Sequence, residues 1–439
     1  MTTRPPPAYV LWFGPTGLSV ARALGREGIP VVGLHHDVNE PCAGTRYARV
    51  EILPPLSSGD GPWLEYLLAH GRDLAPVKAV LIPGSDASWM FAWRHRAALA
   101  PYFHVSMPQH GLADEWVGKP YQYAAAERVG IPFPRTFTIA SAADLERAAG
   151  EATLPCLVKP VLSHLWQREY GTKLAFARDV DELMRHGRDA MARGLDIMVQ
   201  EYIPAADDEI YCYYSYRSAE GATLGHCVIR KLRQNEPRFG NSSMSQCIDQ
   251  PRVVEQSLRL MDALDYQGIG AIEFKRDPRD DQFKLMELNV RPTLLMGLAA
   301  DSGVNLPLLA YRDLLGEMPP ARTVTPRRYG RRVGIFMNDL RSARFYHQVD
   351  DMSYAKWLWS WIGARDIYFA WDDWGPFRGY IHMFIDHLRR GRLRGFPLSF
   401  PTPEQWAQGK WDGQVHPTVT TAPDIRRTGK ARTPFGHAA

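Results

Sequence analysis

Three residues near position 280 could together bind a metal ion: Glu273, Glu287 and Asn289. They lie in two apolar runs joined by a turn-rich stretch, a pattern typical of a β-hairpin. In the antiparallel pairing that this pattern predicts, Glu273 lies opposite Glu287 at roughly 5 Å, and Asn289 follows on the same face. Two like charges opposed in a sheet are destabilising unless a cation lies between them. Two carboxylates and an amide oxygen suit Mg²⁺, which water and phosphate oxygens would complete.

The opposite face of the predicted hairpin is apolar. With the turn near Asp280, Ile272 pairs with Leu288, and Phe274 pairs with Met286. The alternative interpretation is a hairpin whose glutamates are merely exposed to solvent. Arg291 comes directly after the second strand and adds a permanent positive charge, which favours an anionic ligand.

The elements that must position these residues alternate along the chain. Strand-like apolar runs occur at residues 9–13, 31–34 and 77–82, with a helical pattern between the first two. This alternation predicts a small α/β layer in residues 1–118. A boundary at Gly118-Lys119-Pro120 starts a second α/β region, which ends at Met318-Pro319-Pro320.

Two lysines and a polar stretch lie at boundaries and strand ends of the second region. Lys119 opens it, Lys159 ends a short apolar strand, and Gln200-Glu201-Tyr202-Ile203 ends another. Each feature alone is as typical of a solvated strand end as of a site. Their order, followed by the carboxylate hairpin and Arg291, resembles the ATP-grasp superfamily of ligases over residues 119 to about 316. Within it, the chain is similar to carboxylate–amine ligases of the D-aspartate ligase-like or carboligase type.

The resemblance implies an α/β (α+β) protein with an ATP-grasp fold. It places a Rossmann-like pre-ATP-grasp domain at residues 1–118 and the nucleotide-binding and catalytic domain at 119–318. A Trp-rich, basic accessory module of helical or mixed structure is expected at 321–396. Residues 397–439 are rich in Pro, Thr, Gly and Gln, which predicts an extended or disordered tail.

The resemblance also assigns roles in binding the nucleotide. It implies that Lys119 and Lys159 contact the phosphates of ATP. The side chain of Gln200 and the backbone of Glu201 and Ile203 would hold the adenine edge.

Further roles concern the ribose, the metal and the reacting groups. Glu209 would bind the ribose hydroxyls, and Arg291 would steady the transferred phosphoryl group or the acyl phosphate. Lys231 and Arg233 would supply cations near the γ-phosphate, although a solvated charge run explains them nearly as well. The metal ligands are expected to be Glu273, Glu287 and Asn289, for Mg²⁺ or alternatively Mn²⁺. The triphosphate lid departs from the superfamily's glycine-rich pattern, and its candidate donors are His164 and Lys173.

The implied reaction is phosphoryl transfer from ATP to a small-molecule carboxylate, followed by attack of an amine on the acyl phosphate. One alternative is a non-catalytic ATP-binding protein. Another is a nicotinamide- or flavin-dependent oxidoreductase, suggested by Gly14-Pro15-Thr16-Gly17 after a strand, but the G-x-G-x-x-G spacing is absent.

Composition limits the partners. The 439 residues carry a net charge of only +4, which argues against a nucleic-acid-binding protein. The absence of a signal-peptide pattern and of C-x-x-C pairs predicts a cytoplasmic protein. Tryptophan and arginine are concentrated after residue 321. Helices that pack on each other or on the catalytic core would explain them, and contact with a membrane surface or a lipid-linked substrate is the alternative. Asp372 and Asp373 could form a binding site for an amine substrate or belong to an exposed turn. The sequence does not determine whether the protein forms an oligomer.

Overall fold

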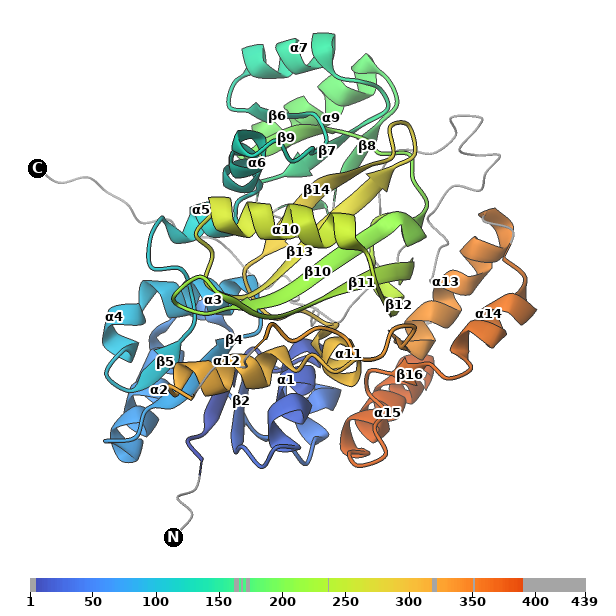
Figure 1. Ribbon diagram of the computed structural model, residues 1–439. Coiled ribbons are helices and arrows are strands. Elements are labelled where there is room, and N and C mark those ends of the chain that lie inside the picture. The colour runs from blue at the N-terminus through green and yellow to red at the C-terminus, as the bar shows by residue number, and fades with distance from the viewer. Residues whose placement is uncertain are drawn as a thin grey trace, which may run out of the picture.

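Three β-sheets organise the protein in the computed structural model (Figure 1). The structure describes residues 5–161, 166, 169–170, 174–235, 237–317, 322–349 and 352–389. His164, Lys173 and the predicted tail at 397–439 lie outside these ranges. None of the helices described is both long and apolar enough to cross a bilayer.

The amino-terminal sheet has five parallel strands in the order β3-β2-β1-β4-β5. Its strands are β1 (Ala8–Leu11), β2 (Val31–His35), β3 (Arg49–Ile52), β4 (Ala79–Pro83) and β5 (Phe103–Val105). The helices of this region are α1 (Pro15–Gly25), α2 (Gly61–Leu74), α3 (Asp86–Arg94), α4 (Arg96–Leu99) and α5 (Ala113–Val117), with short 3₁₀ turns η1 (Pro41–Gly44) and η2 (Leu56–Ser58). β1 and β4 are buried along their whole lengths, as strands of a parallel sheet covered on both faces are. This arrangement confirms the predicted Rossmann-like layer.

A second, antiparallel sheet of four strands has the order β6-β9-β7-β8. It consists of β6 (Thr136–Ile139), β7 (Cys156–Pro160), β8 (Ala175–Ala177) and β9 (Ile197–Glu201). α7 (Ala142–Glu151) and α9 (Val180–Ala192) pack on this sheet and bury Leu145 and Leu183 in a small core of their own. α6 (Lys119–Arg128) precedes the sheet in the chain and lies beside it in Figure 1.

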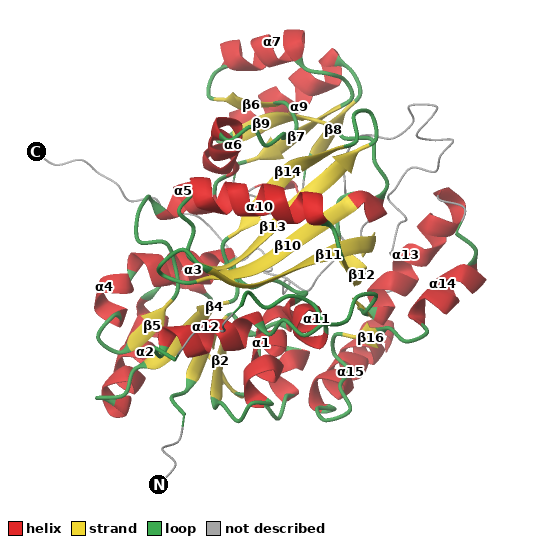
Figure 2. Ribbon diagram, in the orientation of Figure 1, coloured by secondary structure: helices red, strands yellow, loops and turns green. Residues whose placement is uncertain are grey.

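The largest sheet has seven strands in the order β14-β13-β10-β11-β12-β15-β16. Its members are β10 (Ile210–Arg217), β11 (Thr223–Asn235), β12 (Asn241–Ile248), β13 (Gly268–Asp277), β14 (Gln282–Asn289), β15 (Arg332–Gly334) and β16 (Arg365–Asp366), and the 3₁₀ turn η3 (Asp207–Glu209) comes just before β10. α10 (Pro251–Ala263) lies across one face (Figure 2). α11 (Met296–Asp301) and α12 (Leu306–Leu314) pack with α1 against the other face. The sheet therefore lies between two apolar layers.

The carboxy-terminal region joins this large sheet, since β15 pairs with β12 and β16 with β15. The sheet thus combines strands from both sides of residue 321. Three helices complete the region: α13 (Phe336–Val349), α14 (Tyr354–Trp361) and α15 (Gly375–Arg389).

Two neighbouring aspartates attach this region to the amino-terminal sheet. The buried Asp373 carboxylate accepts hydrogen bonds from Arg22 Nε of α1 at 2.8 Å and from Thr45 Oγ1 at 2.7 Å. Asp372 is partly exposed and pairs with Arg26 at 2.9 Å. Side chains of the protein therefore bind both carboxylates. For Asp373, the structure supports neither of the two interpretations from the sequence, an amine-binding site or an exposed turn.

Candidate active site

The carboxylate hairpin forms with the predicted pairing at its centre. Glu273 of β13 lies directly opposite Glu287 of β14, and Ile272 lies opposite Leu288. The prediction that Phe274 pairs with Met286 is wrong, because a β-bulge after Glu273 shifts the register and brings Leu285 opposite Phe274.

Each glutamate of the pair contacts a lysine from another element. Lys119 Nζ, at the start of α6, lies 3.0 Å from Glu287 Oε2, and Lys231 Nζ of β11 lies 2.7 Å from Glu273 Oε2. Asn289 Nδ2 donates to Glu287 Oε1 at 3.2 Å, so the predicted metal set is assembled in one place. The two lysines offset the repulsion between the facing carboxylates.

The electrostatics of these pairs follow from burial and charge. The Lys119 ammonium lowers the pKa of Glu287 to about 2. Burial alone would lower the pKa values of Lys119 and Lys231, but the adjacent Glu287 and Glu273 carboxylates raise both above their usual range. All three groups are therefore charged at neutral pH.

α6 holds the free edge of the hairpin in place. β14 is the outermost strand, so some of its backbone groups lack a strand partner. The Gln122 side-chain amide donates to Leu288 O at 2.9 Å and accepts from Leu288 N at 2.7 Å. Tyr123 OH donates to Met286 O at 2.9 Å. Lys119, Gln122 and Tyr123 thus fix the strand that carries Glu287 and Asn289.

Lys159 lies beside this group but has a different partner. Its Nζ donates to Gln200 Oε1 at 2.8 Å, and Gln200 Nε2 donates to Tyr123 OH at 2.9 Å and to Thr136 Oγ1 at 3.0 Å. Gln200 is fully buried, and its amide is already bonded on both sides. The structure therefore places the Gln200 side chain as a support for Lys159, whereas the sequence assigned it to the adenine edge. Burial and the nearby Lys119 charge lower the pKa of Lys159 to about 7.

The segment after β9 carries the other groups predicted to hold the nucleotide base. The Glu201 side chain pairs with Arg279 at 2.5 Å, and the adenine-binding role of its backbone stays a prediction. The carbonyl oxygen of Ile203 accepts a hydrogen bond from Lys275 Nζ at 3.0 Å, and Lys275 also lies over the Tyr202 ring.

Lys275 is a site residue that the sequence reasoning missed. It follows Glu273 by two positions in β13, so period-two alternation places both side chains on one face and could have identified it. It is buried, and burial lowers its pKa to about 8.

The predicted ribose ligand, Glu209, belongs to η3 and is mostly buried. Its carboxylate lies 2.9 Å from Arg276 Nε and 3.6 Å from Arg230 Nη2. Alternation along β11 and β13 places Arg230 and Arg276 on the sheet face opposite to Lys231 and Lys275. The ribose role of Glu209 stays a prediction.

Arg291 connects the hairpin to the amino-terminal sheet. Its guanidinium binds both carboxylate oxygens of Asp86, at 2.6 and 3.0 Å. Asp86 is the first residue of α3, just beyond the carboxyl end of β4, and the sequence reasoning missed it. β1 and β4 run side by side where the strand order reverses, which is where open α/β sheets bind ligands.

The residue after β1 at this edge has an unusual backbone. Trp12 adopts a positive φ of 66°, which is costly for a bulky side chain and is most often found at functional sites. Gly84, after β4, approaches β1 so closely that a Cβ would lie 2.8 Å from Leu11 O. The two strand ends are therefore packed against each other beside Asp86.

Arg233 pairs with a residue of the carboxy-terminal region, and its role near the γ-phosphate stays a prediction. It is buried and binds Asp339 of α13 through two hydrogen bonds of 2.8 and 2.6 Å. The ion pair of Arg233 with Asp339 therefore attaches α13 to β11. Of the two basic residues, Lys231 is the one that contacts a glutamate of the pair.

The donor set fits a hard divalent cation. Among the described residues, no three His, Cys, Asp or Glu side chains come together as a metal site. Glu273 and Glu287, with the Asn289 amide oxygen, would therefore share an ion with oxygens from the ligand and from water.

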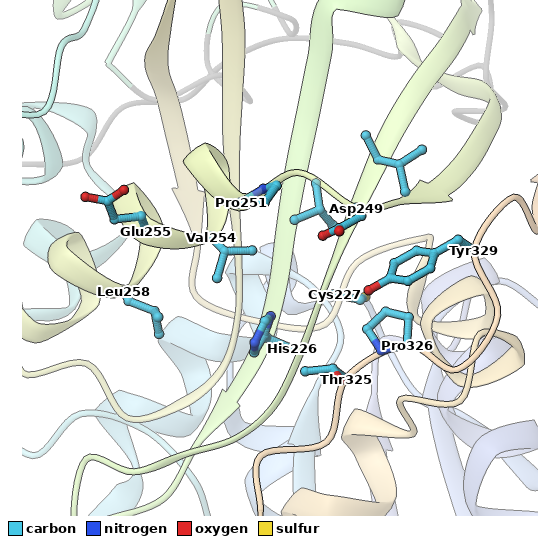
Figure 3. A pocket seen from close by; sticks show the side chains of 12 residues that line it. His226, Cys227, Asp249, Pro251, Val254, Glu255, Leu258, Thr325, Pro326 and Tyr329 are labelled. Atoms are coloured by element: carbon cyan, nitrogen blue, oxygen red, sulfur yellow. The ribbon is translucent and has the colours of Figure 1, made fainter.

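A separate pocket of about 500 Å³ lies between α10, β11, β12 and the segment after Thr325 (Figure 3). His226 and Val228 line it, and alternation along β11 places them on the face opposite to Lys231. The pocket contains none of the predicted site residues.

Comparisons with known proteins agree with this geometry. Residues 196–335 match the family described as ATP-grasp in the biosynthetic pathway with Ter operon. The chain is 22% identical to D-aspartate ligase from Enterococcus faecium over 303 residues, covering 65% of this chain and 71% of that protein.

Solved structures with a similar fold include a ligase and a synthetase. L-amino acid ligase from Bacillus licheniformis has a TM-score of 0.53 and 15% identity, covering 71% of this chain and 75% of that one. N5-carboxyaminoimidazole ribonucleotide synthetase from Thermus thermophilus has a TM-score of 0.55 and 18% identity, covering 73% and 81%. At these identities the likeness establishes the fold.

Proposed function

We propose that this chain, which carries an ATP-grasp domain, is a ligase that uses ATP to join a carboxylate to an amine. A carboxylate oxygen of the acid attacks the γ-phosphorus of ATP, and ADP leaves. The amine then attacks the carbonyl carbon of the acyl phosphate, loses a proton and displaces inorganic phosphate. The product is an amide, and no covalent intermediate with the protein is required.

The observation that carries this proposal is the pair of facing glutamates with a lysine against each one. Glu273, Glu287 and Asn289 would hold Mg²⁺, with Mn²⁺ as the alternative, and a bound ion would neutralise phosphate charge. Lys119 and Lys231 lie within 3.0 Å of these carboxylates, so they would meet the phosphates beside the ion. Such fixed cations stabilise charge that spreads over the transferred group.

Lys159 and Arg291 complete the proposed binding of the reacting groups. Lys159 donates to Gln200, and it would exchange this contact for one with a phosphate oxygen when ATP binds. Arg291 joins the hairpin to Asp86 at the carboxyl ends of β1 and β4, where an acid or amine substrate would bind. In this proposal Arg291 orients the carboxylate, and Asp86 exchanges its contact with Arg291 for one with the substrate.

Adenine and ribose would lie along the backbone of Glu201 and Ile203 and beside Glu209. Lys275 supports this segment through the carbonyl oxygen of Ile203.

We propose the same domain boundaries as the sequence suggests, with the nucleotide-binding and catalytic domain at residues 119–318.

The cellular setting is also part of the proposal. All five cysteines are unpaired and buried, as in proteins of reducing compartments, which supports a cytoplasmic enzyme.

Trp359 and Trp371 are exposed by 70% and 80%, which supports contact with a membrane surface or a lipid-linked substrate. Co-sedimentation with anionic liposomes tests that contact, and unchanged sedimentation of a Trp359→Ser, Trp371→Ser variant would remove it. Light scattering tests for an oligomer.

The proposed reaction is tested by screening amino acids and dipeptides for ADP release, with mass analysis of the products. We expect ADP and a condensed product that requires both an acid and an amine. Binding of Mg-ATP with no ADP release from any pair would favour the non-catalytic alternative. Thermal protection by a reduced nicotinamide, without protection by Mg-ATP, would favour the oxidoreductase.

A further inference from the structure

One face of α13 contacts three consecutive residues at the end of β11. Asp339 binds Arg233, Ser342 Oγ donates to Asn235 Oδ1 at 3.3 Å, and Tyr346 OH accepts from the backbone N–H of Gln234 at 2.6 Å. Positions 339, 342 and 346 lie on one side of a helix, so the helix as a whole is aligned with the strand. Lys231, which contacts Glu273, lies two residues before Arg233.

The Asp339 carboxylate is a buried point of attachment with five donors. It is fully buried and accepts from Arg233 Nε and Nη2, from Ser243 Oγ at 2.7 Å, and from two indole N–H groups of α14. The indoles belong to Trp357 and Trp361, each at 2.8 Å. These contacts explain part of the tryptophan surplus of this region, and they fix α13 and α14 on the strand.

The same helix also reaches the segment that would hold ribose and adenine. The Tyr346 hydroxyl donates to Asp207 Oδ2 at 2.5 Å, and Asp207 is the first residue of η3, two positions before Glu209. Asp207 is almost fully buried, and it also accepts from the backbone N–H of Arg238 at 2.9 Å. The Tyr346 hydroxyl group thus joins η3 to the end of β11, while Arg230, earlier in β11, pairs with Asp208 of η3 at 2.9 Å.

We propose that α13 supports the nucleotide site from outside, with Tyr346 as a positioning residue that fixes η3 against the end of β11, beyond the segment that carries Lys231. This inference rests on the proposed function, since it needs ATP to bind between these elements. Tyr346 touches neither the predicted phosphate ligands nor the metal set, and it acts through Asp207 and Gln234. The carboxy-terminal region therefore contributes to ATP binding without contacting ATP.

The test is the Tyr346→Phe variant, which removes one oxygen atom. The matched control is Tyr380→Phe, a buried tyrosine of α15 that stacks on Tyr368 away from η3 and β11. For Tyr346→Phe we expect the Kd and KM for ATP to rise at least fivefold, while kcat and the KM for the acid change less than twofold. Tyr380→Phe should leave all four constants within twofold.

Two outcomes would overturn the inference. One is an ATP Kd of Tyr346→Phe within twofold of that of the wild type, and the other is an equal rise in the KM for ATP and for the acid, which indicates general loosening. Ser342→Ala provides a second variant, for which we expect a smaller rise in the ATP Kd, and no rise would also count against α13. Failure of the wild type itself to bind Mg-ATP would instead overturn the proposed function.

Discussion

At the scale of single residues, the site depends on charges that are paired before any ligand arrives. Glu287 contacts Lys119, and Glu273 contacts Lys231, so neither carboxylate bears the full cost of facing the other. A bound cation would take over that role and release both ammonium groups toward phosphate. In this proposal each lysine exchanges its glutamate partner for a phosphate oxygen when ATP binds.

Replacing one carboxylate of the pair tests this arrangement. We expect Glu287→Gln to lower the rate of ATP-dependent product formation by about 10²–10³-fold, because it removes one anionic ligand and leaves Lys119 unpaired. Steady-state ADP release measures the effect. The control Glu146→Gln changes an exposed glutamate of α7 and should retain full activity. Wild-type rates for Glu287→Gln would refute the metal assignment.

The lowered pKa of Lys159 leads us to expect that the protein takes up a proton when it binds ATP. Its pKa of about 7 in the free protein leaves roughly a tenth of it protonated at pH 8. Adjacent phosphates favour the charged form, so binding raises the pKa and draws in up to about one proton. Calorimetry of Mg-ATP binding in two buffers of different ionisation enthalpy measures this uptake. It should shrink at pH 6, where Lys159 is already charged, and fall by most of a proton at pH 8 in Lys159→Met. Equal uptake in wild type and variant would contradict the assignment.

At the scale of elements, α6 makes an exposed strand edge into a rigid support. The Gln122 amide satisfies both backbone groups of Leu288, between the two β14 residues of the metal set. Without this amide, both groups would be buried at the strand edge without a partner.

Removing that amide should cost stability. We expect Gln122→Met to lower the free energy of unfolding by about 1–3 kcal/mol, because the buried N–H and C=O of Leu288 lose their partners. Urea denaturation measures the change. Gln246→Met is the control, since its amide makes one long, exposed bond to Gly330 O and should cost far less. Equal effects of the two changes would show that the edge contact is unimportant.

Contacts between residues close together in the sequence could be predicted, whereas contacts between residues far apart in the sequence could not. The pairing of Glu273 with Glu287 follows from period-two alternation across a short turn, so it was predictable. The bulge that displaced Phe274 leaves no pattern in the apolar residues. The buried contact of Arg233 with Asp339 could not be predicted, because the two residues are more than a hundred positions apart in the sequence. The contacts of the Gln200 amide with Tyr123 and Thr136 were hidden in the sequence for the same reason, and its adenine role stays a prediction.

At the scale of the whole molecule, the carboxy-terminal region is built into both neighbouring parts. β15 continues the large sheet, and Asp373 binds Arg22 of the amino-terminal layer in a buried pair. The sequence predicted a separate basic module because neither contact is visible in composition. The tryptophan surplus accordingly divides between buried Trp357 and exposed Trp359 and Trp371.

Two adjacent aspartates allow a matched test of this attachment. Asp373→Asn leaves the Arg22 guanidinium buried without a counter-charge, so we expect a loss of about 3–5 kcal/mol in the free energy of unfolding. Asp372→Asn breaks a partly exposed pair with Arg26 and should cost less than about 1 kcal/mol. Chemical denaturation of both variants compares them directly. Similar losses would mean that the buried pair does not hold the regions together.

The central claim is that ATP phosphorylates a carboxylate, and following oxygen tests it most directly. The acid identified by the ADP-release screen is labelled with ¹⁸O in both carboxylate oxygens and incubated with ATP, Mg²⁺ and the amine. The acyl-phosphate route predicts that one ¹⁸O atom appears in the inorganic phosphate for each amide formed, as read by mass spectrometry. Unlabelled phosphate, or release of AMP and pyrophosphate in place of ADP, would contradict it.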